Sequence, residues 1–130
     1  MYSHVTVGTN DYAAAKAFYD AILPLLGLQC IHADADEGAA GWAVDADRAP
    51  HFWLVRPFDR QAATVGNGVT VAFEAGDRAT VDAFHAAALA AGARDEGAPG
   101  LRAHYHPDYY GAYLRDLDGN KLCVVCHRPA

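Results

Sequence analysis

Cysteine, methionine and basic residues are all scarce in this chain of 130 residues. It has 3 cysteines and 1 methionine, and its 10 Lys and Arg residues face 16 Asp and Glu, for a formal net charge of −6. The odd set of Cys30, Cys123 and Cys126 fits a reducing compartment better than a disulfide framework. The few basic residues are spread along the chain and form no stripe that would track phosphates, so we expect no nucleic-acid partner.

Long apolar runs are also missing. No stretch approaches the roughly 18 apolar residues that a membrane span requires. The first residues, Met-Tyr-Ser-His, show neither the basic nor the apolar segment of an export signal. We therefore expect a cytoplasmic protein with no membrane partner, of a size that suits one domain with a real core.

The sequence does contain an internal repeat of about sixty residues, in which the same order of predicted strands and helix occurs twice. In the first copy, residues 4–8 alternate and are rich in β-branched side chains, which predicts a strand. Asn10 and Asp11 are a capping pair for a helix predicted over residues 12–23. Three further strands are predicted at residues 28–32, 40–44 and 51–56.

The second copy follows the same order. A strand is predicted at residues 69–73, and Asp77 caps a helix that extends to residue 91 and ends at Gly92. A short strand around residues 101–104 is expected next. Two hairpin strands then flank the turn at residues 118–120, whose Asp-Gly-Asn sequence tolerates positive φ angles.

These elements predict an α+β fold in which residues 1–130 form one domain of two βαβββ modules, at about 1–57 and 68–128. Each module alone is too small to bury a comfortable core. Paired, they would bury both helices against one continuous, cupped mixed β-sheet, with the helices on its outer side.

Several segments in this order resemble a known family. They are residues 4–11 (HVTVGTND), 17–19 (AFY), 26–28 (LGL), 71–73 (VAF) and 117–122 (LDGNKL). Together they resemble the vicinal oxygen chelate superfamily, which includes glyoxalase I, extradiol dioxygenases, and fosfomycin and bleomycin resistance proteins. The resemblance covers nearly the whole chain and implies the fold described above and a homodimer. It does not imply one reaction, because such members run unrelated chemistries on one scaffold.

The resemblance also marks positions for a metal site. Metal-using members take ligands from four equivalent strand positions, which fall here on His4, Trp53, Thr70 and Cys123. Only His4 keeps the family's residue type, and three of the four positions are not matched. Losing a carboxylate and a second imidazole removes both charge and ligand count. We therefore expect no metal and no other cofactor.

By the same resemblance, the chain binds a small molecule in a pocket on the cupped sheet. The expected lining, including the rim, is His4, Trp53, Thr70, Cys123, Tyr110, Tyr113 and His106. Tyr110 and Tyr113 lie on opposite faces of their strand, so at most one of them points into the cup. For any chemistry, His4 is the expected general base and Cys123 the expected nucleophile.

Two alternatives to this function stay open. One is a metal-dependent lyase or dioxygenase with non-standard ligands, such as His4 and Cys123 together with a residue from a partner chain. The other is a protein that sequesters a drug or metabolite without turnover. Metal dependence separates the first alternative from the rest, and consumption of the ligand separates an enzyme from a sequestering protein.

Two motifs favour other chemistry at first sight. Residues 123–127 (CVVCH) match the short string for covalent haem attachment, but the two valines favour a strand that places Cys123 and Cys126 on opposite faces. His104, His106 and Asp108 would share one face of an extended segment and resemble a two-His, one-carboxylate iron site. Three ligands so close in sequence rarely surround one face of an ion, so contact with a ligand, or a plain loop, is the preferred interpretation.

Overall fold

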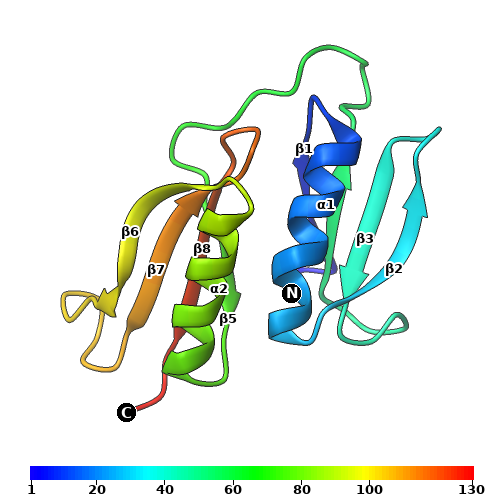
Figure 1. The fold of residues 1–130 in the computed structure, drawn as a ribbon. Coiled ribbons are helices and arrows are strands. Elements are labelled where there is room, and N and C mark those ends of the chain that lie inside the picture. The colour runs from blue at the N-terminus through cyan, green and yellow to red at the C-terminus, as the bar shows by residue number, and fades with distance from the viewer.

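The computed structural model describes residues Met1–Ala130, which form two βαβββ modules (Figure 1). The first module contains β1 (His4–Gly8), α1 (Tyr12–Ile22), the 3₁₀-helix η1 (Leu23–Leu26), β2 (Gln29–Asp34), β3 (Ala39–Ala43) and β4 (His51–Val55). The second contains β5 (Val71–Glu74), α2 (Arg78–Ala90), β6 (Arg94–Leu101), β7 (Tyr110–Arg115) and β8 (Lys121–Cys126). The predicted α+β fold of two such modules is confirmed.

Each module has its own four-stranded mixed sheet, in the orders β1-β4-β3-β2 and β5-β8-β7-β6. In both, the first and last strands of the module are parallel neighbours and the remaining pairs are antiparallel. No strand pairing joins β1 to β5, so the chain forms two separate sheets instead of the expected continuous one. Both helices lie on the same side of the pair of sheets (Figure 1). We call the opposite side of each sheet its inner face.

The helices begin where the caps predict. Asp11 accepts a hydrogen bond from the Ala14 amide at 3.1 Å, and Asp77 accepts one from the Thr80 amide at 2.7 Å. Helix α1 gives way to η1 at Leu23, where Pro24 prevents the α-helix from continuing. Neither α-helix has the length and apolarity that a membrane crossing requires.

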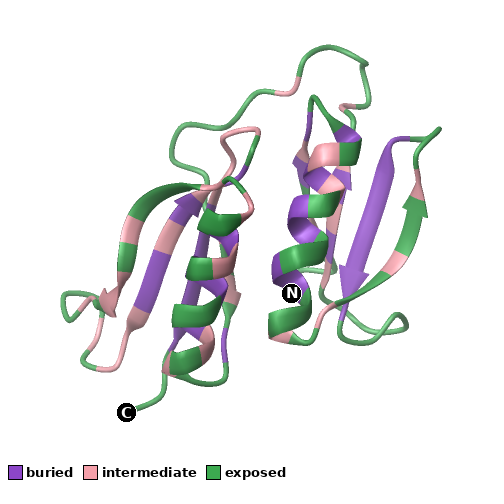
Figure 2. Cartoon of the chain, in the orientation of Figure 1, coloured by how far each residue is buried: buried purple, intermediate pink, exposed green.

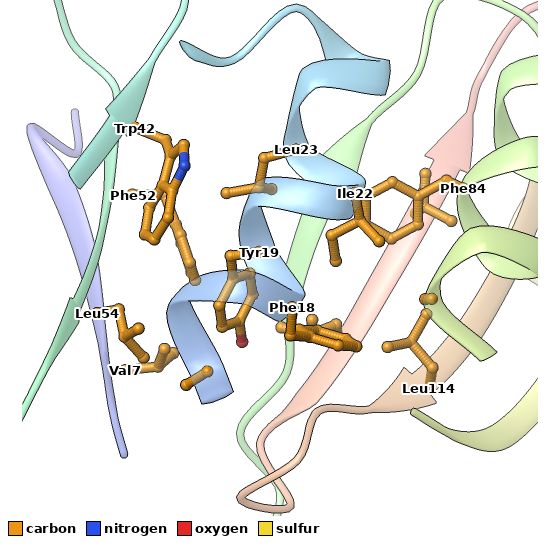
Figure 3. Packing of buried hydrophobic residues seen from close by; sticks show 14 of the residues in the cluster. Val7, Phe18, Tyr19, Ile22, Leu23, Trp42, Phe52, Leu54, Phe84 and Leu114 are labelled. Atoms are coloured by element: carbon orange, nitrogen blue, oxygen red, sulfur yellow. The ribbon is translucent and has the colours of Figure 1, made fainter. Parts of the chain in front are cut away.

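One hydrophobic core spans both modules and fills the space between the helices and the two sheets (Figures 2 and 3). Tyr19 of α1 and Phe52 of β4 have ring centroids 4.9 Å apart, and Phe52 meets Phe73 of the second module at 5.3 Å. Phe73 in turn lies 6.1 Å from Phe84 of α2. This aromatic series joins the two modules into one packed unit.

The strand predicted around residues 101–104 is misplaced, and the extended segment considered at residues 104–108 does not form. The strand expected around residues 101–104 lies earlier, at β6, where Gly97, Pro99 and Gly100 interrupt the alternation that marks a strand. The pairing of β6 with β7 is shifted at these positions. The segment after β6 is a series of turns, so His104, His106 and Asp108 do not share one face of an extended strand.

Candidate functional site

Alternation along β8 decides which side chains reach the inner face of the second sheet. Leu122, Val124 and Cys126 belong to the core beneath α2, whereas Cys123 and Val125 point to the inner face. The prediction that Cys123 and Cys126 lie on opposite faces is therefore confirmed. Cys123 is only 1% exposed, because the segment between β6 and β7 covers it.

This covering segment, residues 102–109, is a closed loop. The Arg102 amide donates to the Tyr109 carbonyl at 2.8 Å, which ties the two ends together. The ring of Tyr109 then lies over Gly111, where a Cβ atom would stand 2.9 Å from a ring carbon. Because Gly111 has no side chain, the ring can approach the sheet closely. The loop thus delivers Tyr109 to the inner face.

Three polar side chains meet beneath this loop and form the candidate site. Tyr113 on β7 is paired directly with Cys123 on β8. The Tyr113 and Tyr109 hydroxyl groups are 2.8 Å apart, and the Tyr109 hydroxyl lies 3.6 Å from the Cys123 sulfur. Sequence analysis found Tyr113 and Cys123 but missed Tyr109, whose only signal is its place before a strand that contains a glycine at residue 111.

All three groups keep their protons at neutral pH. Burial raises the pKa of the Cys123 thiol. Burial also raises the pKa of Tyr109, and burial together with the Tyr109 hydroxyl raises that of Tyr113. The site therefore presents hydroxyl and thiol donors, and Cys123 holds the less nucleophilic, protonated form.

Two histidines close one side of the site. The Asp108 amide donates to Nδ1 of His106 at 3.1 Å, which assigns the His106 proton to Nε2. That Nε2 lies 2.8 Å from Nδ1 of His127, so His106 donates and His127 accepts. The rings of both histidines stand edge-on to Tyr109, with centroids 5.6 and 5.4 Å away. His106 is thus part of the site, and its partner His127 is a residue that sequence analysis missed.

The first sheet carries two of the other predicted residues on its own inner face. The indole of Trp53 lies over Gly41, where a Cβ atom would stand 2.9 Å from three ring carbons. The ring of His32 flanks it, with centroids 5.6 Å apart. His4 is exposed on β1, and its Nδ1 lies 2.6 Å from the Ser3 hydroxyl. Thr6, two residues further along, is the register partner of Trp53, so His4 and Trp53 share a face.

The remaining two predicted residues lie elsewhere. Tyr110 points to the helix side, where its hydroxyl donates to Asp82 of α2 at 2.6 Å and its ring lies 5.2 Å from the Arg78 guanidinium carbon. Thr70 is exposed and directly precedes β5. The structure therefore groups Tyr113, Cys123 and His106 on the second sheet and His4 with Trp53 on the first.

A cavity of about 460 Å³ lies where the two modules meet. Its apolar wall comes from η1, the loop before β4, and β5, and includes Leu26, Leu28, Val44, Pro50, Ala72 and Phe73. Ala72 is the register partner of Cys123. The cavity therefore reaches β5, which lies next to β8 on the side away from Tyr113, and its volume suits a small organic molecule.

The fold of two βαβββ modules, with polar side chains on the inner faces of the sheets, is typical of one class of proteins. Comparison with known proteins identifies this class. Residues 2–124 match the family model of the Glyoxalase/Bleomycin resistance protein/Dioxygenase superfamily. The chain belongs to this superfamily. No protein with a curated function matches it.

Solved structures agree. A glyoxalase/bleomycin resistance protein from Albidiferax ferrireducens T118 is 41% identical, with a TM-score of 0.82 and 99% of each chain covered. A glyoxalase/bleomycin resistance protein/dioxygenase family enzyme from Burkholderia phytofirmans PsJN is 22% identical, with a TM-score of 0.70 over 97% of this chain and 98% of that one. A lactoylglutathione lyase from Agrobacterium tumefaciens is 20% identical, with a TM-score of 0.66 over 97% and 92%. The last two likenesses concern the fold alone.

The four positions that the resemblance assigns to metal ligands, His4, Trp53, Thr70 and Cys123, do not supply a family-type donor set. The Trp53 indole has no lone pair to offer and covers Gly41. Cys123 is buried beneath the Tyr109 hydroxyl, which lies 3.6 Å from its sulfur, and it replaces the carboxylate of the family's site. No three His, Cys, Asp or Glu side chains lie close enough together to hold a metal ion. The residues present thus do not fit a His and carboxylate site.

Proposed function

We propose that this protein binds a small organic molecule at the inner faces of its sheets, without a family-type metal. The observation that carries the proposal is the hydrogen-bonded group of Tyr109, Tyr113 and Cys123 on the inner face of the second sheet. Small-molecule sites combine an apolar surface with a few convergent polar groups; here the polar groups converge on the second sheet, and the apolar cavity lies beside β5.

The proton inventory of this group supports a binding role. Each of its three side chains carries one proton, which it can donate either to a neighbour within the group or to a ligand. The rings of His106 and His127 pack edge-on against the ring of Tyr109, and the three rings offer a planar molecule a surface to pack on. On the first sheet, Trp53 offers a second planar surface.

Tryptophan emission tests the proposal. Trp53 is half-buried on the inner face, whereas Trp42 is fully buried and donates to Asp20 at 3.0 Å. We expect a saturable emission change with at least one compound from a library of small aromatic and aliphatic molecules. The change should disappear in Trp53→Phe, which keeps Trp42 as an internal reference, and binding should weaken in Tyr113→Phe. Mass analysis of the recovered compound then separates an enzyme from a sequestering protein.

Metal content tests the second half of the proposal. Tag-free protein is offered Ni, Zn, Fe, Mn and Co, desalted and analysed by plasma mass spectrometry. We expect metal well below one ion per chain. Near-stoichiometric retention that His4→Ala abolishes would overturn the metal-free proposal and favour a lyase or dioxygenase with non-standard ligands.

We further propose a homodimer, on the basis of the family resemblance and of the two sheets that a single chain leaves unjoined. A second copy would bring the Trp53 face of one chain into reach of the Tyr113 face of another. Sedimentation equilibrium should give twice the chain mass of 13.9 kDa. A single species at the chain mass, independent of concentration, would contradict this.

A further inference from the structure

Two cations lie around Tyr113 at the inner face of the second sheet. The guanidinium carbon of Arg102 is 5.7 Å from the centre of the Tyr113 ring, and Nζ of Lys121 is 5.4 Å from it. Lys121 comes from β8 and Arg102 from the covering loop, so the fold brings them together from separate elements. Both side chains are half-buried, which weakens the screening of their charges by water.

Neither cation is neutralised by a carboxylate. Arg102 donates to the carbonyl groups of Ala98 and Gly100, at 2.8 and 2.9 Å. None of the salt bridges in the chain involves Arg102 or Lys121. Glu96 on the neighbouring β6 is already held by Arg115 at 3.0 Å. In a protein of net charge −6, the candidate site is thus a local concentration of unbalanced positive charge.

The positive potential reaches the donor group. Burial dominates at Cys123 and raises its pKa, but the charges of Arg102 and Lys121 both act in the opposite direction. Hydroxyl and thiol protons therefore converge with two cations. A carboxylate, which accepts hydrogen bonds and carries negative charge, matches both features.

From this geometry we infer that the ligand of the proposed site is a small organic anion, a carboxylate attached to a planar ring. The carboxylate is attracted by Arg102 and Lys121, which both lie over the Tyr113 ring, and accepts from the hydroxyl donors, and the ligand's ring lies against the aromatic side chains of the loop. The inference rests on the proposed function, because it names the ligand class of the same site.

Three compounds of similar shape but different charge test whether the site prefers an anion. Benzoate, benzamide and benzylamine are titrated into the metal-free protein and followed by ligand-detected NMR. We expect benzoate to bind at least about tenfold more tightly than benzamide, the ratio that corresponds to one charge-assisted hydrogen bond, and benzylamine to bind most weakly. Raising NaCl from about 50 to about 500 mM should weaken benzoate alone.

Variants locate the effect. Lys121→Gln and Arg102→Gln should each weaken benzoate about tenfold and leave benzamide within about twofold. Lys121→Arg keeps the charge and should restore most of the benzoate affinity. Lys16→Gln is the matched control, since it removes the same charge from α1, where Lys16 pairs with Asp20. It should leave benzoate binding unchanged.

Each result decides one of the two claims. Equal binding of all three compounds, lost in Tyr113→Phe, would keep the site and overturn the anion assignment. Preference for benzylamine, or no benzoate binding, would overturn the assignment whatever the emission screen finds. Benzoate binding that Lys121→Gln and Arg102→Gln leave intact would show that the carboxylate binds elsewhere, and it too would overturn the assignment. Failure of the emission screen with every compound class would sink the proposed function itself.

Discussion

The Tyr19 hydroxyl donates a hydrogen bond to the Asp116 carboxylate and joins the two modules across 97 residues of sequence. Tyr19 is fully buried and Asp116 is 5% exposed. The same carboxylate accepts from the amides of Asp118 and Asn120, at 3.0 and 2.8 Å. It therefore holds the β7–β8 turn in shape while it binds helix α1 of the other module.

We predict that Tyr19→Phe lowers the free energy of unfolding by about 1.5–3 kcal/mol, because it removes a hydrogen bond from a buried carboxylate. Urea unfolding followed by circular dichroism measures the change. Tyr12→Phe is the control, since the Tyr12 hydroxyl donates to the neutral Ala39 carbonyl within one module, at 3.0 Å, and should cost about 1 kcal/mol. A smaller loss in Tyr19→Phe than in Tyr12→Phe would contradict the account.

Alkaline pH should destabilise the protein. Burial raises the pKa of Tyr19, as do the charge and hydrogen bond of Asp116, and burial raises that of Tyr113. An unfolded tyrosine ionises near pH 10, whereas these two stay protonated in the fold. Their contribution is thus complete below about pH 10 and is lost as pH rises beyond it.

Urea midpoints measured from about pH 8 to about pH 11 check this prediction. The decline should be shallower in Tyr113→Phe and unchanged in Tyr2→Phe, because Tyr2 is 81% exposed. A parent protein with constant stability across that range would rule the explanation out.

The three cysteines should differ in reactivity. Cys30 is exposed, whereas Cys123 and Cys126 are 1% and 0% exposed and the pKa of Cys123 is raised by burial. Near neutral pH, iodoacetamide should alkylate Cys30 at least about tenfold faster than either buried thiol. Peptide mass spectrometry measures the three rates, and the urea-unfolded chain should react at all three. Equal rates for Cys30 and Cys123 in the folded protein would mean that the loop does not cover the inner face.

Gly41 should be essential to the position of Trp53. A Cβ atom at residue 41 would stand 2.9 Å from ring carbons of Trp53, so Gly41→Ala must displace the indole toward solvent. We expect a red shift of Trp53 emission and a stability loss of about 1–3 kcal/mol, typical of overpacking. Gly76→Ala, where no atom lies within 4 Å of the added carbon, should change neither by more than about 0.5 kcal/mol. An unchanged spectrum in Gly41→Ala would disprove close packing on Gly41.

The fold was predictable because its signals are local. Asp11 and Asp77 mark the starts of the two helices, and alternating side chains mark most of the strands. Together these local signals predict the order of the elements. Strand β6 was misplaced because its glycines and proline remove that alternation, and its pairing with β7 compensates for the loss. The separation of the sheets depends on packing between distant segments, which no local pattern encodes.

Alternation along regular strands predicted only part of the candidate site. The period of two placed Tyr110 and Tyr113 on opposite faces of their strand, and Cys123 and Cys126 on opposite faces of theirs, but it left open which tyrosine faces inward. Tyr109 reaches the site through a turn, and His106 meets a histidine 21 residues away. Such contacts depend on the path of the loop, and no periodic pattern in the sequence predicts them.

The covering loop of residues 102–109 has a consequence for how selectivity can change. Its ends are tied to each other through the hydrogen bond between Arg102 and Tyr109, and it carries one of the two cations and the central hydroxyl of the site. The remaining contacts come from the scaffold strands. Under the proposed function, replacing this loop with that of a relative should therefore change the ligand preference while the eight strands and their shared core stay in place.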